Sequence, residues 1–307
     1  MKNTVLAAEP SAAQAAAVNI SVILPVLDGE DTLASQLDAL ANQTYTGPWE
    51  LIIADNGSSD QSVAVANAWR DRLPRLVVVD ASHRAGRAAA CNAGARAARA
   101  DAFAFCDADD VASPQWLEMC VEASRAHHLV AGALDHYTLN PSAPRWKRRV
   151  LARPPLMPGW KAFADGANMI VSRAAFEAVG GYSEEWLRAA DVDLSWRLEA
   201  AGYPLYFEPA AVMAKRGRST YRGIWRQSAA WGVADVELRN RHPRIGRLPG
   251  EDAPAGFVCT LLKDARLRDR ELLFDLLRPR HHRSWLAASA RLWGRLSAST
   301  GQRWGKQ

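Results

Sequence analysis

Short apolar runs alternate with helical segments over the first third of this 307-residue chain. The runs span 20–26, 50–55, 76–79 and 102–106, and the helical segments between them span 30–42, about 60–71 and 86–100. Such runs, bounded by helices, are typical of buried strands. Strands that are joined through helices form parallel sheets with right-handed crossovers. The sequence therefore predicts an α/β, Rossmann-like fold whose mainly parallel sheet is flanked by helices.

The second half of the chain is less regular. Its pattern predicts helices over 114–124, 191–201 and 221–241, strands over 129–139, 168–173 and 205–208, and a loop over 140–159.

Acidic residues follow two of the first four strands. Asp55 ends the second strand, and Asp107 begins the run Asp107-Ala-Asp-Asp110 after the fourth. Ligands of open α/β sheets bind at the carboxyl ends of the strands, so both acids are expected at one binding rim. A reaction that releases a diphosphate must neutralise its charge, and Mg²⁺ or Mn²⁺ held by one of the two acids Asp107 and Asp109 would do so. The alternative is an acidic cap on the helix that follows.

Basic residues lie at the start of the helix over 86–100. Arg84 and Arg87 are expected at the same rim, because arginine side chains and helix N-termini both suit phosphates. Arg96 and Arg99 are better explained as a solvated helix face.

These motifs together resemble family 2 glycosyltransferases of the GT-A fold. The resemblance rests on segments in matching order over about 19–235: Ser21–Val26, Ala54–Asp60, Gly86–Gly94, Phe105–Asp110, Gly166–Asn168, Val179–Tyr182 and Asp191–Leu198. It implies inverting transfer of a sugar from a nucleoside-diphosphate sugar to a hydroxyl of a glycan, a lipid-linked sugar or a small molecule. It assigns Asp191 as the general base.

The site expected from motifs and resemblance has three parts. Donor contacts are expected from Pro25, Asp55, Arg84, Arg87 and Asp107, a metal ligand from Asp109, and acceptor or leaving-group contacts from Asn168, Lys215, Arg216 and Trp231. An acid suits the role of base because the attacking hydroxyl must lose its proton in a one-step displacement. Asp191 could instead cap its helix, and Asp193 is a competing base.

Three positions depart from the family pattern. Ala190 stands where relatives commonly have an acid, and Ala230 where processive relatives have an arginine. Lys215 and Arg216 occupy the stretch in which many relatives have a histidine. We hypothesise that at least one of Lys215, Arg216 and Arg218 reaches the leaving diphosphate instead.

Two other functions fit parts of the pattern. A nucleotidyltransferase would need a basic, glycine-rich loop after the first strand, and 27–30 has no basic residue. A degenerate transferase that binds without turnover would account for Ala190 and Ala230. A nicotinamide-dependent dehydrogenase is excluded, since no GxGxxG motif follows the first strand.

Charge and hydropathy bound the surroundings of the protein. The net charge is +5, and residues 266–307 alone carry ten Lys/Arg against three acids. The basic charge therefore belongs to the C-terminal tail, and nucleic acid is not an expected partner. Neither a signal peptide nor a spanning segment is found, and three cysteines lie in apolar or helical contexts, so a cytoplasmic protein is expected. We divide the chain into a disordered leader (1–18), a catalytic domain (19–235) and a basic helical extension (236–307).

The tail carries an apolar stripe at helical spacing. Its members are Trp285, Ala288, Leu292, Trp293 and Leu296, with Arg283, Arg291 and Arg295 largely outside it. The stripe fits docking on the protein or a second subunit, which we favour, or peripheral contact with anionic lipid at the inner face of a membrane. The sequence leaves the oligomeric state open.

Overall fold

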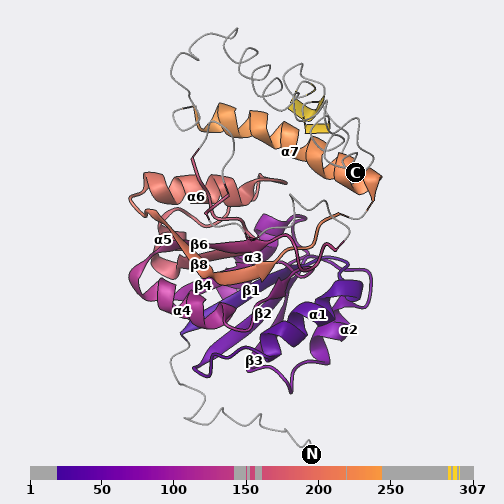
Figure 1. Ribbon diagram of the computed structural model, residues 1–307, viewed down its shortest axis with the longest axis vertical. Coiled ribbons are helices and arrows are strands. Elements are labelled where there is room, and N and C mark those ends of the chain that lie inside the picture. Colours follow the sequence, from indigo (N-terminus) through magenta and orange to yellow (C-terminus); the bar gives the residue numbers. More distant parts are fainter. Residues whose placement is uncertain are drawn as a thin grey trace, which may run out of the picture.

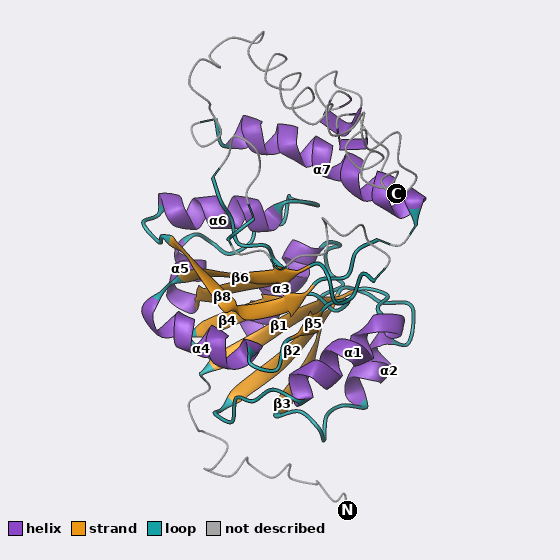
Figure 2. Ribbon diagram, viewed as in Figure 1, coloured by secondary structure: helices purple, strands orange, loops and turns teal. Residues whose placement is uncertain are grey.

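The computed structural model describes residues 19–141, 150, 153–155, 161–218, 220–243, 290, 291, 293–295 and 297. This part of the chain forms one eight-stranded sheet with helices on both faces (Figures 1 and 2). The strands are β1 (Ile20–Val26), β2 (Trp49–Asp55), β3 (Arg75–Asp80), β4 (Ala102–Cys106), β5 (Val111–Ala112), β6 (Leu129–Asp135), β7 (Asn168–Ser172) and β8 (Leu205–Ala214). The helices are α1 (Glu30–Ala41), α2 (Ser62–Asn67), α3 (Arg87–Ala97), α4 (Trp116–Ala126), α5 (Arg173–Ala178), α6 (Ala190–Ala200) and α7 (Tyr221–Arg241).

The sheet order is β3-β2-β1-β4-β7-β6-β8-β5. Strands β3, β2, β1 and β4 are parallel, whereas β7 runs antiparallel between β4 and β6. Strand β8 is parallel to β6, and β5 is antiparallel to β8. The predicted mixed, mainly parallel sheet is confirmed. Because β1 lies between β2 and β4, the carboxyl ends of all three strands share one edge.

Alternating side chains of the strands build a core on each face of the sheet. Val22 and Leu24 belong to the core that contains residues of α1 and α4, whereas Ile23 belongs to the core that contains residues of α3, α5 and α6. Helix α3 lies very close to β1, because a Cβ on Gly94 would lie only 2.5 Å from Cγ2 of Ile23. The first residue of α3, Arg87, lies at the strand-end edge, where its Nε donates to Asp107.

Helix α7 packs outside α6, and the described residues of the C-terminal segment pack on α7 (Figure 1). A Cβ on Gly232 would lie 2.1 Å from the carbonyl oxygen of Arg291, so the two backbones touch. Arg291 and Arg295 both donate to Asp235, which is 2% exposed. Both arginines are therefore bound to α7, and the peripheral contact with anionic lipid stays a prediction. Of the apolar stripe, the structure describes Trp293 only. The other four stripe residues and Arg283 lie outside the described ranges.

Most predicted elements are confirmed, with changes at their ends. Strand β6 ends at Asp135 and not at residue 139, because the Asp135 carboxylate accepts hydrogen bonds from the amides of Tyr137 and Thr138 and closes a turn. Strand β8 continues to Ala214 through a register shift opposite Gly132 and Ala133. The predicted domain boundary at 235 falls inside α7. Residues 1–18, Cys259 and most of the predicted 140–159 loop lie outside the described ranges.

Two further expectations concern the interior and the membrane. Cys91, Cys106 and Cys120 are buried free thiols, as predicted, and burial raises the pKa of Cys91 to about 11. Within the described residues, no helix combines the length and the apolar character needed to cross a bilayer.

Candidate active site

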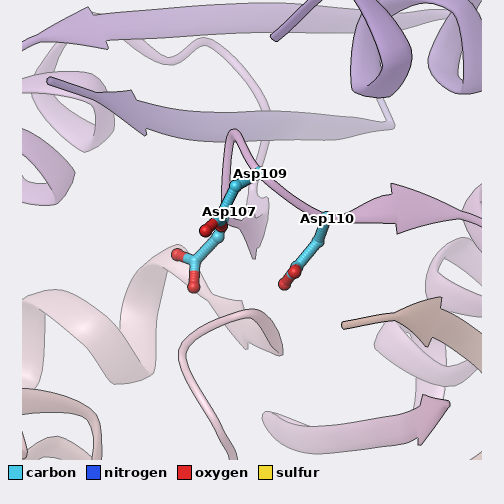
Figure 3. A group of neighbouring side chains, drawn as sticks. All are labelled: Asp107, Asp109 and Asp110. Atoms are coloured by element: carbon cyan, nitrogen blue, oxygen red, sulfur yellow. The ribbon is translucent and has the colours of Figure 1, made fainter. Parts of the chain in front are cut away.

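Three carboxylates meet in the turn between β4 and β5 (Figure 3). Asp107, Asp109 and Asp110 each place one oxygen within 4.8 Å of the other two. Asp110 is 1% exposed, whereas Asp107 and Asp109 are partly exposed. Asp107 and Asp109 are expected here from the sequence, whereas Asp110, which belongs to the same acidic run, had no predicted role.

The electrostatics of this carboxylate cluster favour a cation. Burial, and then the charge of Asp107, raise the pKa of Asp110 to about 8, and the same two causes raise the pKa of Asp109. Oδ1 of Asp110 accepts a hydrogen bond from the Arg216 amide at 2.8 Å, but Oδ2 is buried without a partner. Carboxylate oxygens are the ligands that Mg²⁺ and Mn²⁺ prefer. The residues therefore fit a divalent ion that would satisfy the orphaned oxygen and offset the crowded charge.

Arg87 connects the carboxylate cluster to a loop on the other side of the site. Its Nε donates to Oδ1 of Asp107 at 2.9 Å, and its Nη2 donates to the carbonyl of Gly166 at 2.6 Å. A Cβ on Gly166 would lie 2.6 Å from Nη1, so glycine is what allows the guanidinium to approach. Burial lowers the pKa of Arg87, but the charge of Asp107, together with the other acidic groups around it, outweighs burial and raises the pKa, so Arg87 stays protonated.

The other predicted donor residues lie along the strand-end edge, with one exception. Asp55 ends β2, is partly exposed and accepts a hydrogen bond from the Ser58 amide at 3.2 Å. Pro25 is the partly exposed residue of β1 and lies in register with Ala54. Arg84 instead lies 3.8 Å from Glu184 and is half exposed, so its charge is directed toward a different loop.

Asp191, the predicted base, lies in the first turn of α6. Its Oδ2 accepts a hydrogen bond from the Gly166 amide at 2.9 Å, and its Oδ1 accepts one from the Val192 amide at 3.0 Å. Burial, and then the charge of Asp165, raise its pKa. Gly166 therefore bonds the base through its N–H and Arg87 through its carbonyl, so one peptide segment joins the two halves of the site.

The two alternatives for Asp191 meet specific obstacles. The N-cap of α6 is Ala189, in a left-handed conformation with φ of 58°, so Asp191 is not the cap. Asp193 is 4% exposed and accepts hydrogen bonds from Arg197 and His242, each at 2.8 Å. Burial raises the pKa of Asp193, but these two partners outweigh it and lower the pKa. Its carboxylate is therefore committed to joining α6 to the end of α7.

The cations after β8 have separate surroundings. Lys215 Nζ donates to Oδ1 of Asp165 at 2.6 Å, and Arg216 Nε donates to the carbonyl of Asp109 at 2.9 Å. Arg218 is exposed and has no acidic hydrogen-bond or ion-pair partner within the described ranges. Asp165 was not among the predicted site residues, since its only sequence signal is its place directly before Gly166.

Two residues expected in the acceptor or leaving-group region are occupied elsewhere. Asn168 is fully buried: Trp116 Nε1 donates to its Oδ1, and its Nδ2 donates to the carbonyls of Ala133 and Ala211. It therefore joins α4 to three strands and has no atom left for a substrate. The Trp231 ring packs against the core cluster that contains residues of α3, α5 and α6, with the Arg291 guanidinium 5.8 Å away, so it contributes to packing.

Comparisons with known proteins agree on the family. The family model described as glycosyl transferase family 2 matches residues 21–180, which ends before Asp191. The chain is 28% identical over 241 residues to the pre-mycofactocin glycosyltransferase of Mycobacterium tuberculosis, covering 73% of this chain and 48% of that protein. It therefore spans about half the length of that relative. It is 25% identical over 232 residues to glycosyltransferase AglE of Haloferax volcanii, covering 72% and 76%.

Solved structures share the fold at low identity. The mannosyltransferase PcManGT from Pyrobaculum calidifontis, in complex with GDP-Man and Mn²⁺, matches with a TM-score of 0.65 and 16% identity over 94% of this chain and 89% of that one. S. aureus TarS 1–349 in complex with UDP matches with a TM-score of 0.51 and 16% identity, over 93% of each chain. The structures bear on the fold alone, and the family match covers more than half of the sequence. This chain is a GT-A-fold member of glycosyl transferase family 2.

Proposed function

We propose that this protein transfers a sugar from a nucleoside-diphosphate sugar to an acceptor hydroxyl, with inversion at the anomeric carbon. The observation that carries the proposal is the Gly166 segment, which bonds Asp191 on one side and Arg87, and through it Asp107, on the other. A displacement needs a base and a leaving-group site in a fixed relation to each other. The named activities of the family relatives, and the sugar nucleotide in the mannosyltransferase structure, support this reaction class.

Donor binding is assigned to the strand-end edge. Asp55 offers a partly exposed carboxylate that can accept hydrogen bonds from the nucleoside, and Pro25 lies on the neighbouring strand β1, in register with Ala54. Asp107 is held by Arg87, so one of its oxygens has a fixed direction. We assign Arg87 to positioning Asp107 and the Gly166 segment, whereas Arg84, which lies 3.8 Å from Glu184, has no part in this assignment.

The carboxylate cluster is assigned to the metal. Asp109, with Asp107 and Asp110 beside it, would hold Mg²⁺ or Mn²⁺. Such an ion supplies charge neutralisation for the departing diphosphate. Of the cations after β8, Arg218 is best placed to add to this, because Lys215 and Arg216 already bond Asp165 and the Asp109 carbonyl.

Asp191 is assigned as the base that takes the proton of the acceptor hydroxyl. Burial and the nearby charge of Asp165 raise its pKa, which makes the carboxylate a stronger proton acceptor near neutral pH. The two N–H groups that it accepts from hold its orientation without neutralising it.

The test is a donor panel with Mn²⁺ and a set of hydroxyl acceptors. Release of nucleoside diphosphate, dependent on acceptor, together with an inverted anomeric configuration in the product by NMR, is the expected result. Donor binding without any diphosphate release would favour a degenerate transferase that binds without turnover, the alternative suggested by Ala190 in place of an acid. Release of pyrophosphate from a nucleoside triphosphate would favour a nucleotidyltransferase.

A further inference from the structure

A largely buried ion pair, which the proposed reaction does not use, lies beside the base. Lys215 Nζ and Asp165 Oδ1 are 2.6 Å apart, and the two side chains are only 26% and 19% exposed. Lys215 is anchored at its own backbone, where its amide donates to the Asp135 carbonyl at 2.8 Å. The pair therefore joins the loop before β7 to the end of β8.

The same carboxylate shapes the Gly166 segment. Oδ1 of Asp165 also accepts a hydrogen bond from the Ala167 amide at 3.0 Å, and the Asp165 carbonyl accepts one from the Asn168 amide at 2.8 Å. An aspartate that bonds the amide two residues on closes an Asx-turn and fixes the peptide between them. That peptide carries the Gly166 N–H that bonds Asp191.

The other end of the pair lies beside the carboxylate cluster. Arg216, the next residue after Lys215, bonds Oδ1 of Asp110 through its amide and the Asp109 carbonyl through its guanidinium. The loop that contains Asp165 and Gly166 is thus connected to the carboxylate cluster twice. One connection runs through Arg87, and the other runs through Lys215 and the adjacent Arg216.

We propose that Asp165 and Lys215 are positioning residues that hold the Gly166 turn, and with it Asp191, at a fixed place relative to the carboxylate cluster. The assignment rests on the proposed function, since it takes Asp191 as the base. It also replaces the earlier hypothesis for Lys215: its ammonium is paired with the largely buried Asp165 carboxylate at 2.6 Å, and we assign it to that contact in place of the leaving diphosphate.

The test uses Asp165→Asn, Lys215→Gln, the double variant and Lys215→Arg in the full chain. We expect each single change to lower kcat by roughly tenfold or more with the donor KM unchanged, because small misplacements of reacting groups slow the chemical step. The double variant is expected to be no slower than either single one, since both remove the same contact. Lys215→Arg is expected to recover most of the loss. Lys161→Gln, which removes a more exposed pair with Glu199 near the same loop, is the matched control and is expected to have no effect.

Hydrogen exchange gives a readout that does not depend on turnover. Asp165→Asn and Lys215→Gln are expected to speed exchange equally in peptides covering 163–168 and 188–194, while melting temperatures show that the chain remains folded. Unchanged exchange there would overturn the positioning role even if no donor supports transfer. So would full or increased kcat in Asp165→Asn together with a raised donor KM in Lys215→Gln, because that pattern places Lys215 on the diphosphate. If Asp165→Asn does not fold, Lys215→Gln against Lys215→Arg decides the matter.

Discussion

Asp191→Asn separates the chemical role of this side chain from its structural role. The carboxylate accepts two backbone N–H groups, from Gly166 at 2.9 Å and from Val192 at 3.0 Å. Asparagine has the same shape but only one acceptor oxygen, so one of the two N–H groups loses its partner. Asparagine also cannot take a proton from an acceptor hydroxyl.

The two losses differ in size. A hydrogen bond to a charged acceptor contributes about 1.5–3 kcal/mol to stability. Part of that is offset, because burial and Asp165 oppose the charge on Asp191, as its raised pKa indicates. A net destabilisation of about 1–2 kcal/mol lowers the melting temperature by only several degrees in a protein of this size. Loss of a general base slows turnover by roughly 10²–10⁴-fold. The rate should therefore fall far more than stability.

The assay pairs saturating-donor turnover at 25 °C with thermal denaturation, and Asp193→Asn is its matched control. Asp193 is buried against Arg197 and His242, so its replacement should lower the melting temperature more than Asp191→Asn does. Its turnover well below the melting temperature should remain near that of the unaltered protein. Donor binding, measured by calorimetry, should be kept in both variants.

The pH dependence follows from the same carboxylate. A raised pKa means that Asp191 is protonated, and inactive as a base, over a pH range in which an ordinary aspartate is still ionised. The acid limb of the kcat profile should therefore lie above the usual aspartate range, with activity lost as the pH falls through it.

Near-normal turnover in Asp191→Asn, or an inactive but folded Asp193→Asn, would show that the base is assigned to the wrong carboxylate.

Three further predictions concern the metal, the leaving group and the tail. Asp109→Ala should abolish transfer and Asp110→Asn should weaken Mn²⁺ binding in calorimetry, whereas full activity after EDTA treatment would exclude a metal role. Arg218→Gln should lower kcat/KM for the donor by about 10–100-fold, the size expected for one lost hydrogen bond to a charged group, and unchanged donor kinetics would remove Arg218 from the site. A chain that ends at Arg280 should bind anionic liposomes in co-sedimentation as the full chain does, but it should melt at a lower temperature, because Asp235 loses Arg291 and Arg295 as partners. Loss of lipid binding on truncation would support the membrane role instead.

The first half of the fold could be read from the sequence because its signals are local. Strands β1, β2 and β4 are short apolar runs that are buried on both faces, and each of these runs stands apart from the helices beside it. Asp55 and Asp107 follow directly from this, since they stand where their strands end.

The second half required information that local patterns do not hold. Strand β7 enters between β4 and β6 in the antiparallel sense, a pairing that joins segments far apart in the chain. The length of β8 depends on its register against β6, which shifts between Gly132 and Ala133. Neither feature can be seen in the apolar pattern of the strand itself. The predicted strand therefore ended at residue 208, whereas β8 continues to Ala214.

The site was predicted in its carboxylates but not in the contacts that connect them. The junction between Asp191 and Arg87 consists of the N–H and C=O of Gly166, and a backbone group has no residue-type signal. Asn168 shows the opposite error: an amide in a family motif suggested a substrate contact, but its buried side chain is bonded to Trp116 and two carbonyls. Only the topology decides which of these uses applies.

The tail shows why an amphipathic stripe does not by itself identify what covers it. Periodicity marked one face of the segment, but the partner of Arg291 and Arg295 is Asp235, 56 and 60 residues earlier in the chain. Anionic lipid attracts each arginine near its surface by about 1 kcal/mol, or about 2 kcal/mol for this pair. Moving both away would leave Asp235, at 2% exposure, without these cations, and removing one partner of a buried ion pair costs about 3–5 kcal/mol. On these magnitudes the intramolecular contact is the stronger of the two, so we expect α7 to retain both arginines even where anionic lipid is present.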